Sequence, residues 1–189
     1  MLEEILKYDK EVFLLLNNLG SETWDGFWMF ITNKFSSIPL YLLLLFLSYK
    51  QMGIKKTAAL LVVAILMITA TNGLADFFKY GIQRLRPCFD ADVNELARLV
   101  KDSCGGKFGY FSAHAGNTMA VAAFFSILLK GKYRHIGIFL LVWALLVGFS
   151  RIYIGVHFPL DVFTGMVMGL FFGWLFAKLF IFVLPKIRL

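Results

Sequence analysis

Long apolar segments limit what this chain can fold into more than any other feature of its sequence. Four of them are easily delimited, at residues 57–78, 113–129, 136–149 and 160–184. A helix needs about 20 apolar residues to cross a bilayer, and it satisfies its own backbone hydrogen bonds there. Hydrophobic residues make up 59% of the chain and charged residues 16%, a composition outside the range of soluble globular domains. We therefore predict an all-α, polytopic transmembrane helical bundle, formed as a single membrane-embedded domain over residues 1–189.

The N-terminal part has a weaker pattern. Residues 2–19 carry apolar and charged side chains with the period of a helix face, which predicts an amphipathic helix at the membrane interface. Residues 23–32 form a second short helix that either follows the first or opens the first span. We favour one span over residues 27–49, kinked before Pro39, with Lys34 facing the protein interior. The bundle then has five to six spans.

Basic residues in the short connections indicate the orientation of the bundle. They gather on one side of the predicted spans: Lys50, Lys55, Lys56, Lys130, Lys132, Arg134, Lys186 and Arg188. The positive-inside rule assigns this side to the cytoplasm. The opposite, extracytoplasmic side holds residues 79–112 and 151–157, so we predict a multi-pass inner (plasma) membrane protein with its polar regions outside. The formal net charge of +7 is scattered between apolar runs, which argues against a nucleic-acid partner.

The stretch from Ser150 to Asp161 places ionisable side chains at the end of an apolar segment, where they are costly unless they have a function. Pro159 suits the first turn of a helix, which puts His157 and Asp161 about one turn apart on one face. A carboxylate there accepts the imidazole Nδ1–H and leaves Nε2 oriented as a nucleophile or base. Arg151 supplies a planar cation suited to phosphate. The alternative is an interfacial anchor without chemistry.

Cys88 and Cys104 are the two cysteines of the chain, and both lie in the long polar connection after Lys79. In an oxidising compartment a disulfide between them would add about 3 kcal/mol of stability by restricting the unfolded chain. Two unpaired thiols are the alternative. No further Cys or close His pair completes a metal site, so no metal is expected.

Three polar clusters stand out in the sequence: Lys79 with Arg86 and Pro87, Ser112 with His114, and Ser150 and Arg151 with His157 and Asp161. They resemble the motifs of the type 2 phosphatidic acid phosphatase superfamily, which read K-x6-R-P, P-S-G-H and S-R-x5-H-x3-D. The first and third motifs match at every defined position: Lys79, Arg86 and Pro87, then Ser150, Arg151, His157 and Asp161. The middle motif matches at Ser112 and His114, whereas Phe111 and Ala113 replace its Pro and Gly. Ala113 keeps a small side chain and a free backbone N–H for phosphate, and the rigidity of this turn is left open.

The resemblance implies a phosphatase in which His157 is the nucleophile and forms a phosphohistidine. Asp161 would orient His157, and His114 would protonate the leaving group and then activate water. The residues implied to bind phosphate are Lys79, Arg86, Ser112, Ala113, Ser150 and Arg151. Because three cations supply the positive charge, no metal or other cofactor is implied.

Each of these residues also has a purely structural explanation. Lys79 is a span-end lysine, Ser112 a helix N-cap, and His114 a hydrogen-bonded interface histidine. Asn72 and Asp76 lie near the outer end of a predicted span and either support the site or pack helices. The placement of all three clusters on one membrane face favours the catalytic interpretation.

The implied substrate is a lipid phosphate or diphosphate presented by the bilayer. Undecaprenyl diphosphate is our first expectation, because an outward-facing site in a compact chain suits recycling of a lipid carrier. Phosphatidylglycerol phosphate, phosphatidic acid and lipid A phosphates are the alternatives within the family. Soluble vanadate-dependent haloperoxidases share the motifs, but this chain is too apolar for that class. A non-catalytic membrane transporter or binding protein is the alternative of a different class, and the oligomeric state stays open.

Overall fold

The structure, a computed structural model, describes residues 1–183 and 185 and is built from helices. Six are α-helical within this part: α1 (Leu2–Asn18), α2 (Glu22–Thr32), α3 (Ile38–Ile82), α4 (Ala113–Leu129), α5 (Ile136–Tyr153) and α6 (Pro159–Val183). Two short 3₁₀ turns, η1 (Lys34–Ser37) and η2 (Pro87–Phe89), join them. The described residues form no strand beyond one isolated bridge between Leu85 and Phe108. The predicted all-α helical bundle is confirmed.

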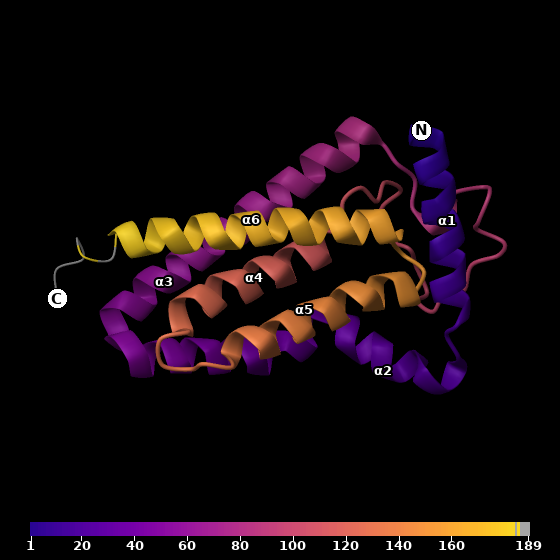
Figure 1. The fold of residues 1–189 in the computed structure, drawn as a ribbon. Coiled ribbons are helices and arrows are strands. Elements are labelled where there is room, and N and C mark those ends of the chain that lie inside the picture. The colour runs from indigo at the N-terminus through magenta and orange to yellow at the C-terminus, as the bar shows by residue number, and fades with distance from the viewer. Residues whose placement is uncertain (184, 186–189) are drawn as a thin grey trace.

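Helix α3 reverses direction within its length. Gly53 has φ 78° and ψ 173°, a conformation that Gly adopts without a steric penalty, and it divides the helix into two arms. Gln51 Nε2 donates to the carbonyl of Leu128 at 2.9 Å, so the reversal lies beside the end of α4. With α4, α5 and α6, five segments therefore run along the bundle, while α1 lies across one end of it (Figure 1).

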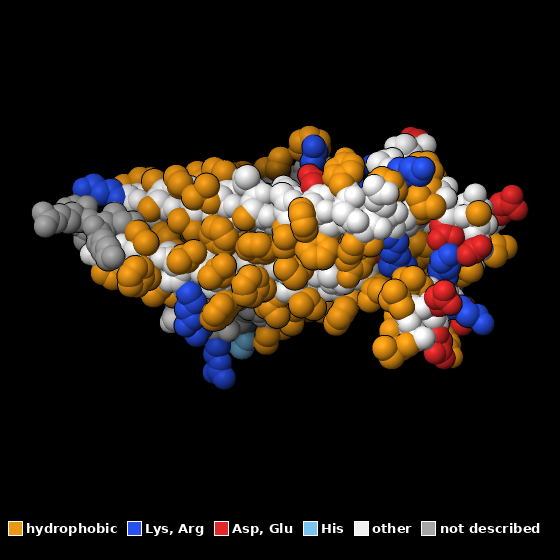
Figure 2. Space-filling model, turned by 90° about the horizontal axis from the view of Figure 1, so that it is seen from above, with side chains coloured by type: hydrophobic (Ala, Val, Ile, Leu, Met, Phe, Trp, Pro, Cys, Tyr) orange, Lys and Arg blue, Asp and Glu red, His pale blue; other side chains and the backbone are white. Residues whose placement is uncertain are grey.

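The length and composition of these helices suit a bilayer. Three helical stretches of the described chain are long and apolar enough to cross it, namely Lys34–Ile82, Ile136–Tyr153 and Pro159–Val183. Helix α4 is apolar but has only 17 residues. Hydrophobic side chains cover the flank of the molecule, and most charged side chains on this face lie toward its two ends (Figure 2).

The cationic end of the bundle is the one farthest from α1. Lys132 Nζ donates to the carbonyl of Lys50 at 3.2 Å, which brings the α4–α5 connection beside the reversal of α3. The basic residues of these two connections therefore lie at the same end of the bundle, as predicted. Lys186 and Arg188, assigned to the same side from the sequence, lie outside the described residues, as does Leu184 at the end of the last predicted span.

The single span predicted over residues 27–49 is wrong. Helix α2 ends at Thr32, and Asn33 is extended with its side-chain oxygen accepting the N–H of Phe35 at 2.9 Å, which caps η1. A new helix then begins at Ile38, with Pro39 in its first turn. Lys34 does not face the interior: it is exposed, with its ammonium 5.1 Å from the ring centroid of Phe35.

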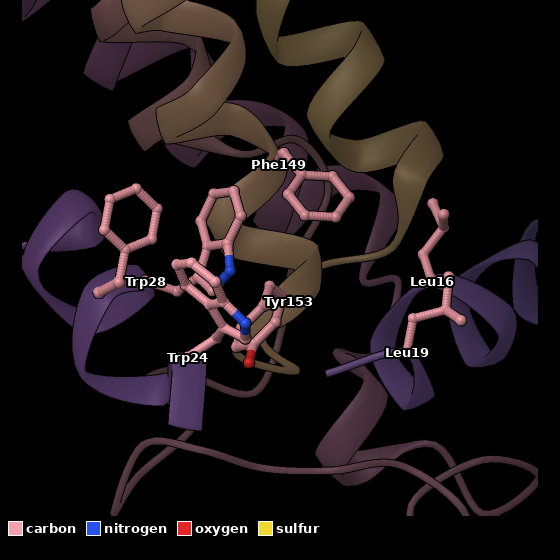
Figure 3. A pocket seen from close by; sticks show the side chains of 7 residues that line it. Leu16, Leu19, Trp24, Trp28, Phe149 and Tyr153 are labelled. Atoms are coloured by element: carbon pink, nitrogen blue, oxygen red, sulfur yellow. The ribbon is translucent and has the colours of Figure 1, made fainter. Parts of the chain in front are cut away.

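Helix α2 instead follows α1 as a separate interfacial helix. An apolar cavity of about 330 Å³ separates the two helices and is lined by Leu16, Leu19, Trp24, Phe27, Trp28, Phe149 and Tyr153 (Figure 3). Trp28 stacks on Tyr153 with ring centroids 5.2 Å apart, and the Tyr153 hydroxyl donates to the carbonyl of Ser21 at 2.9 Å. These contacts fasten α2 to the end of α5, where rings with one polar atom suit a membrane interface.

Helix α5 extends four residues beyond the predicted end at residue 149. No residue breaks the helix before Gly155, which has φ 81°, so Ser150 and Arg151 belong to the last turn of α5. Likewise, α3 continues past residue 78 to Ile82 and ends at Gln83 in the left-handed conformation. Helix α4 has the predicted bounds.

Helices α4 and α6 pack at backbone contact. Gly165, Gly169 and Gly173 form a stripe on α6, and a Cβ on Gly169 would lie 2.1 Å from the carbonyl oxygen of Gly116. Small residues of this kind allow close helix approach in membranes. Next to the stripe, the backbone N–H of Ser112 donates to the carbonyl of Asp161 at 2.9 Å. The N-terminal ends of these two helices, which carry two of the sequence motifs, are thereby held together.

Candidate active site

The first turn of α4 presents the middle motif. Ser112 is fully buried as the N-cap residue, and its hydroxyl oxygen accepts the N–H of Ala115 at 3.5 Å. The N–H groups of Ala113 and His114 belong to the first helical turn, where backbone donors lack a partner within the helix. Phe111, which stands where the family has Pro, is fully buried with its ring centroid 5.7 Å from that of Phe78. Packing therefore holds this turn where the family uses a proline ring.

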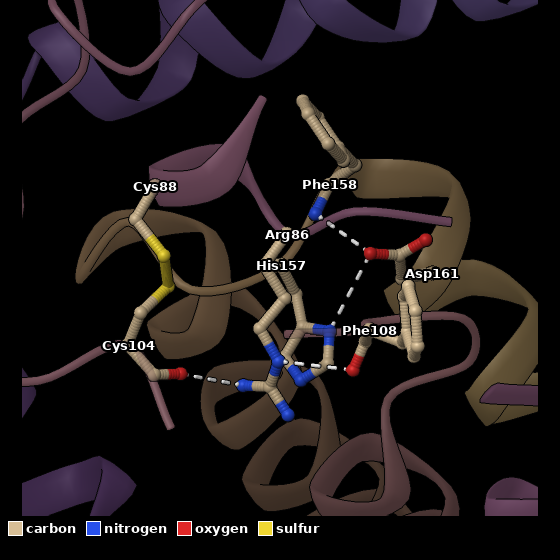
Figure 4. The surroundings of a disulfide bond; sticks show 7 residues. All are labelled: Arg86, Cys88, Cys104, Phe108, His157, Phe158 and Asp161. Carbon is tan, nitrogen blue, oxygen red and sulfur yellow. Dashed lines mark hydrogen bonds and ion pairs between the residues drawn. A yellow bond between two sulfur atoms is a disulfide. The ribbon is translucent and has the colours of Figure 1, made fainter. Parts of the chain in front are cut away.

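His157 and Asp161 are paired at the start of α6. Asp161 is completely buried, and its Oδ2 accepts the N–H of Phe158 at 3.1 Å and lies 3.4 Å from His157 Nδ1 (Figure 4). This contact uses Nδ1, so Nε2 is the ring nitrogen that is not engaged by the carboxylate. The predicted spacing of one turn thus gives the expected pair.

Three cations surround His157. Burial, followed by the positive charges of Arg86, Arg151 and Lys79, lowers the pKa of His157 well below its ordinary value of 6.5. At neutral pH the ring is therefore uncharged, and a neutral imidazole has a nitrogen lone pair available for attack.

Gly109 marks the point where distant segments converge. A Cβ on Gly109 would lie 2.9 Å from Arg86 Cγ, 3.2 Å from Asp161 Oδ2 and 3.6 Å from His157 Nδ1. Its N–H donates to the carbonyl of Arg84 at 2.9 Å. The first and third motifs therefore meet around a backbone segment that has no side chain to separate them.

Arg86 is held by the loop that contains the two cysteines. Its Nη1 donates to the carbonyl of Cys104 at 2.9 Å and its Nε to the carbonyl of Phe108 at 3.2 Å (Figure 4). Cys88 and Cys104 are joined in a disulfide, with Cα atoms 6.4 Å apart. The disulfide thus closes the same loop that orients the guanidinium of Arg86 toward His157.

Arg151 and His114 share a polar cavity of about 370 Å³ beside the site. Its lining residues are Met29, Thr32, Asn33, Lys34, Lys101, His114 and Arg151. Arg151 is 7% exposed and donates through Nη1 to the Thr32 hydroxyl, while its Nε is buried without a partner among the described residues. A buried guanidinium N–H without a partner indicates a place for an anion.

Two predicted phosphate ligands have other partners in this structure. Lys79 Nζ donates to Asp76 at 2.9 Å, so Asp76 holds the lysine near the site. The Ser150 hydroxyl donates to the carbonyl of Val147 at 2.6 Å, within its own helix. Asn72, the other polar residue of this span, accepts from Asn117 Nδ2 at 2.8 Å and ties α3 to α4.

Some residues of the site were not expected from the sequence. Arg84 Nη1 donates to Asp161 Oδ1 at 2.8 Å, and Lys101 lines the cavity with His114. Asp9, on the interfacial helix, pairs with Arg84. Arg84 lies within the first motif, at one of its undefined positions, and Asp9 is one of several charges on α1. No motif or periodic pattern in the sequence sets Arg84 or Asp9 apart from the other charged residues nearby.

Fold and site together define the class of this protein. It is a helical membrane protein that holds a buried, neutral imidazole among cations at one end of its bundle, an arrangement suited to phosphate. Residues 57–183, well over half of the chain, match the PAP2 superfamily. The chain belongs to the PAP2 superfamily, as its motifs indicated.

Characterised relatives share most of the length of the chain. A lipid A 4'-phosphatase of Bacteroides thetaiotaomicron is 31% identical over 178 residues, which are 93% of this chain and 78% of the relative. An undecaprenyl-diphosphatase of Sulfolobus acidocaldarius is 26% identical over 181 residues, 94% of this chain and 81% of the relative. The crystal structure of a transmembrane PAP2-type phosphatidylglycerolphosphate phosphatase from Bacillus subtilis has the same fold, with a TM-score of 0.74 at 22% identity, covering 98% of this chain and 88% of that one. The expected class of enzyme, a lipid phosphatase of the membrane, is confirmed.

Proposed function

We propose that the chain hydrolyses a phosphate or diphosphate of a membrane lipid through a phosphohistidine at His157. The observation that carries the proposal is the buried His157–Asp161 pair, with Nδ1 and Oδ2 3.4 Å apart, surrounded by Arg86, Arg151 and Lys79. Phosphoryl transfer requires an aligned nucleophile and cations for the equatorial oxygens, and this pocket offers both.

The proposed reaction has two displacements. In the first, the Nε2 lone pair of His157 forms a bond to phosphorus while the P–O bond to the leaving group breaks, and His114 gives a proton to the leaving oxygen. In the second, His114 takes a proton from water, the water oxygen attacks phosphorus, and the N–P bond breaks to release inorganic phosphate. Asp161 keeps the Nδ1 proton in place throughout and stabilises the ring when it carries the phosphoryl group.

The cavities beside the site support entry of the lipid tail from the membrane. A cavity of about 170 Å³ shares Thr32, Asn33, Lys34 and His114 with the polar one and reaches Tyr41. From Tyr41 an apolar cavity of about 260 Å³ continues between α3 and α4, lined by Leu45, Leu61, Ala64, Ile68, Val121 and Phe125. A headgroup at His114 with its tail in this series of cavities would enter sideways between the spans, from the extracytoplasmic side of a plasma membrane.

The 4'-phosphate of a lipid A-type glycolipid is the substrate that the relatives favour. The lipid A 4'-phosphatase of Bacteroides thetaiotaomicron aligns with 93% of the chain at 31% identity, above the identity of the undecaprenyl-diphosphatase of Sulfolobus acidocaldarius. This substrate therefore replaces undecaprenyl diphosphate as the first candidate.

Undecaprenyl diphosphate stays the second candidate because of Lys34 and Lys101. Both are exposed lysines that line the cavity with His114, and neither has a carboxylate partner within the described part of the chain. Since His114 would protonate the leaving group, lysines beside it suit a leaving group that carries its own phosphate.

Turnover of defined lipids in detergent tests the function. The purified chain, in EDTA, is assayed for phosphate release from lipid A, undecaprenyl diphosphate, phosphatidylglycerol phosphate and phosphatidic acid. We expect turnover of at least one of them, strongest for lipid A, and its loss in H157A. Undiminished turnover by H157A would show that another residue is the nucleophile, and no release from any of the four lipids would refute the proposal.

The double variant K34A/K101A tests the second candidate. If the two lysines bind a leaving phosphate, KM for undecaprenyl diphosphate rises by about tenfold, a loss of roughly 1.4 kcal/mol, while KM for phosphatidic acid is unchanged. K107A is the matched control, because Lys107 lies in the same loop, 5.9 Å from the Phe108 ring centroid, and does not line the cavity. An equal effect on both lipids would remove this argument for a diphosphate.

A further inference from the structure

Asp161 is the end of a chain of charged contacts that begins on the interfacial helix α1. Arg84 Nη1 donates to Asp161 Oδ1 at 2.8 Å, and the Nη2 of the same guanidinium donates to Asp9 Oδ2. The other oxygen of Asp9 accepts the backbone N–H of Leu160 at 2.8 Å, at the start of α6. One carboxylate of α1 therefore holds both Arg84 and the helix end that carries Asp161.

These charges are buried, so each depends on its partner. Asp161 is 0% exposed and Asp9 is 9% exposed, while the Arg84 side chain is 12% exposed. The Arg84 guanidinium also lies over the ring of Phe158, 4.4 Å from its centroid. A buried charge that loses its partner must find another or move toward water, and either response shifts its neighbours.

The two oxygens of Asp161 divide their contacts between Arg84 and His157. Oδ1 accepts from Arg84, whereas Oδ2 accepts the N–H of Phe158 and faces His157 Nδ1. Because the carboxylate is planar, fixing Oδ1 also fixes the direction in which Oδ2 points. Arg84 thus sets the angle at which Asp161 meets the imidazole.

We propose that Asp9 and Arg84 are positioning residues for Asp161 and His157, so that catalysis requires α1 to be docked with Asp9 in place. The proposal rests on the proposed function, in which His157 is the nucleophile. It assigns the amphipathic helix a role in catalysis beyond attachment to the membrane surface. When Asp9 is replaced, His157 and Asp161 are still present, but they are no longer held at the same angle to each other.

A second set of contacts docks the same helix without reaching Asp161. Lys10, the next residue along α1, pairs with Asp90 at 2.8 Å and with Asp92 at 2.7 Å. Asn17 Nδ2 donates to the carbonyl of Tyr153 at 2.8 Å. Removing Lys10 therefore weakens docking of α1 by a comparable charged contact and leaves the Asp9–Arg84–Asp161 chain intact.

The experiment compares D9N, R84Q, R84K and K10A in the full-length purified chain, with the lipid that the wild type hydrolyses fastest. We expect kcat to fall roughly 10- to 100-fold in D9N and R84Q, the usual effect of losing a group that orients a reacting side chain. KM should stay within about twofold, because the cations that bind phosphate are unchanged. R84K should recover part of kcat, and K10A should behave as wild type.

Equal kcat values for D9N and K10A, whether both high or both low, would overturn the proposal, because docking alone would then explain the effect. Circular dichroism and thermal unfolding in detergent show whether each variant is folded. A rise in KM with unchanged kcat would also contradict a positioning role.

A measurement independent of turnover separates this proposal from the proposed function. The chain has three histidines, so ¹⁵N-histidine NMR in detergent resolves the imidazole of His157, assigned by its absence in H157Q. We expect a neutral ring protonated at Nδ1 in wild type and K10A, and altered ring signals in D9N. If the wild type releases no phosphate but D9N shifts the His157 signals, the proposed function fails and the positioning stands. Unchanged His157 signals in D9N overturn the positioning, whatever the activity.

Discussion

Gly109 is the residue at which the backbone comes close to the proposed reacting groups. It lies between Arg86, Asp161 and His157, and an added Cβ would lie too close to Arg86 and Asp161 while touching His157 at ordinary contact distance. Asp161 and His157 are buried at the start of α6, so they cannot give way without moving that helix. The requirement for Gly at this position comes from close approach of the backbone to the reacting groups.

We expect G109A to lower kcat by roughly 10- to 100-fold, because a displacement of the reacting groups by about 1 Å is enough for such a loss. The added Cβ would lie 2.9 Å from Arg86 Cγ and 3.2 Å from Asp161 Oδ2. Steady-state kinetics on the purified variant measure the effect. G106A is the control in the same loop, since no heavy atom lies within 4 Å of its added Cβ. Similar activity of the two variants would show that Gly109 does not limit the geometry.

The pH dependence of the residual activity in K79Q tests the charge around His157. Lys79 is one of the cations that lower the pKa of His157 below 6.5, so removing its charge raises that pKa. Protonation occupies the lone pair that attacks phosphorus, and activity is therefore lost as pH falls through the pKa of the folded enzyme. The acid limb of kcat/KM should lie at higher pH in K79Q than in wild type.

The same lipid must be used for both proteins, so that ionisation of the substrate phosphate affects both profiles equally. Coincident acid limbs, or a limb at lower pH in K79Q, would contradict the assigned electrostatics.

At the scale of elements, the contact between α4 and α6 decides where two of the three motifs lie. The glycine stripe on α6 lets the two backbones touch, and the Ser112 N–H then reaches the Asp161 carbonyl at 2.9 Å. Stability and site geometry therefore depend on the same interface.

We expect G169A to destabilise the protein by about 1–3 kcal/mol, the usual cost of overpacking, because its Cβ would lie 2.1 Å from the Gly116 carbonyl oxygen. Thermal unfolding in detergent measures this loss. G73A is the matched control: Gly73 is also helical, and nothing lies within 4 Å of its added Cβ. Replacing Gly by Ala at such a site is neutral or stabilising by up to about 1 kcal/mol. A stability of G169A equal to that of G73A would exclude backbone contact between α4 and α6.

At the scale of the whole molecule, the candidate active site and the interfacial helices lie at one end of the bundle. The basic connections lie at the other end. Helix α1 lies across the end that holds the site, and α2 fastens to the last turn of α5 beside it (Figure 1). The disulfide loop closes over the same end. A disulfide at this end and cations at the other agree with a site outside the cytoplasm.

The disulfide provides a test of this arrangement. In protein purified from membranes without reductant, a thiol-alkylating reagent should label Cys88 and Cys104 only after reduction. Because the carbonyl of Cys104 accepts from Arg86 at 2.9 Å, we also expect reduction to lower activity, by loosening Arg86. Labelling before reduction would indicate two free thiols and a loop held by other contacts.

Local sequence patterns were enough to predict the three apolar helices α4, α5 and α6 and the His157–Asp161 pair. The apolar helices α4, α5 and α6 follow from runs of apolar residues, and the pair follows from a four-residue spacing at a helix start, so both depend on neighbours in the chain. The motif residues also identified the family. The predicted span over residues 27–49 failed because helix α2 ends at Thr32, where Asn33 is extended and its side chain accepts the N–H of Phe35 to cap the 3₁₀ turn η1.

Only the tertiary structure decided which charges act together. Asp9 and Arg84 are 75 residues apart, and Arg84 and Asp161 are 77 apart, so no periodicity relates them. Lys34 and Lys101 likewise meet at one cavity from separate connections. Local hydrogen bonding and hydrophobic length determine helices from the sequence, whereas contacts between buried charges depend on how those helices are packed, because only packing brings the partners within reach.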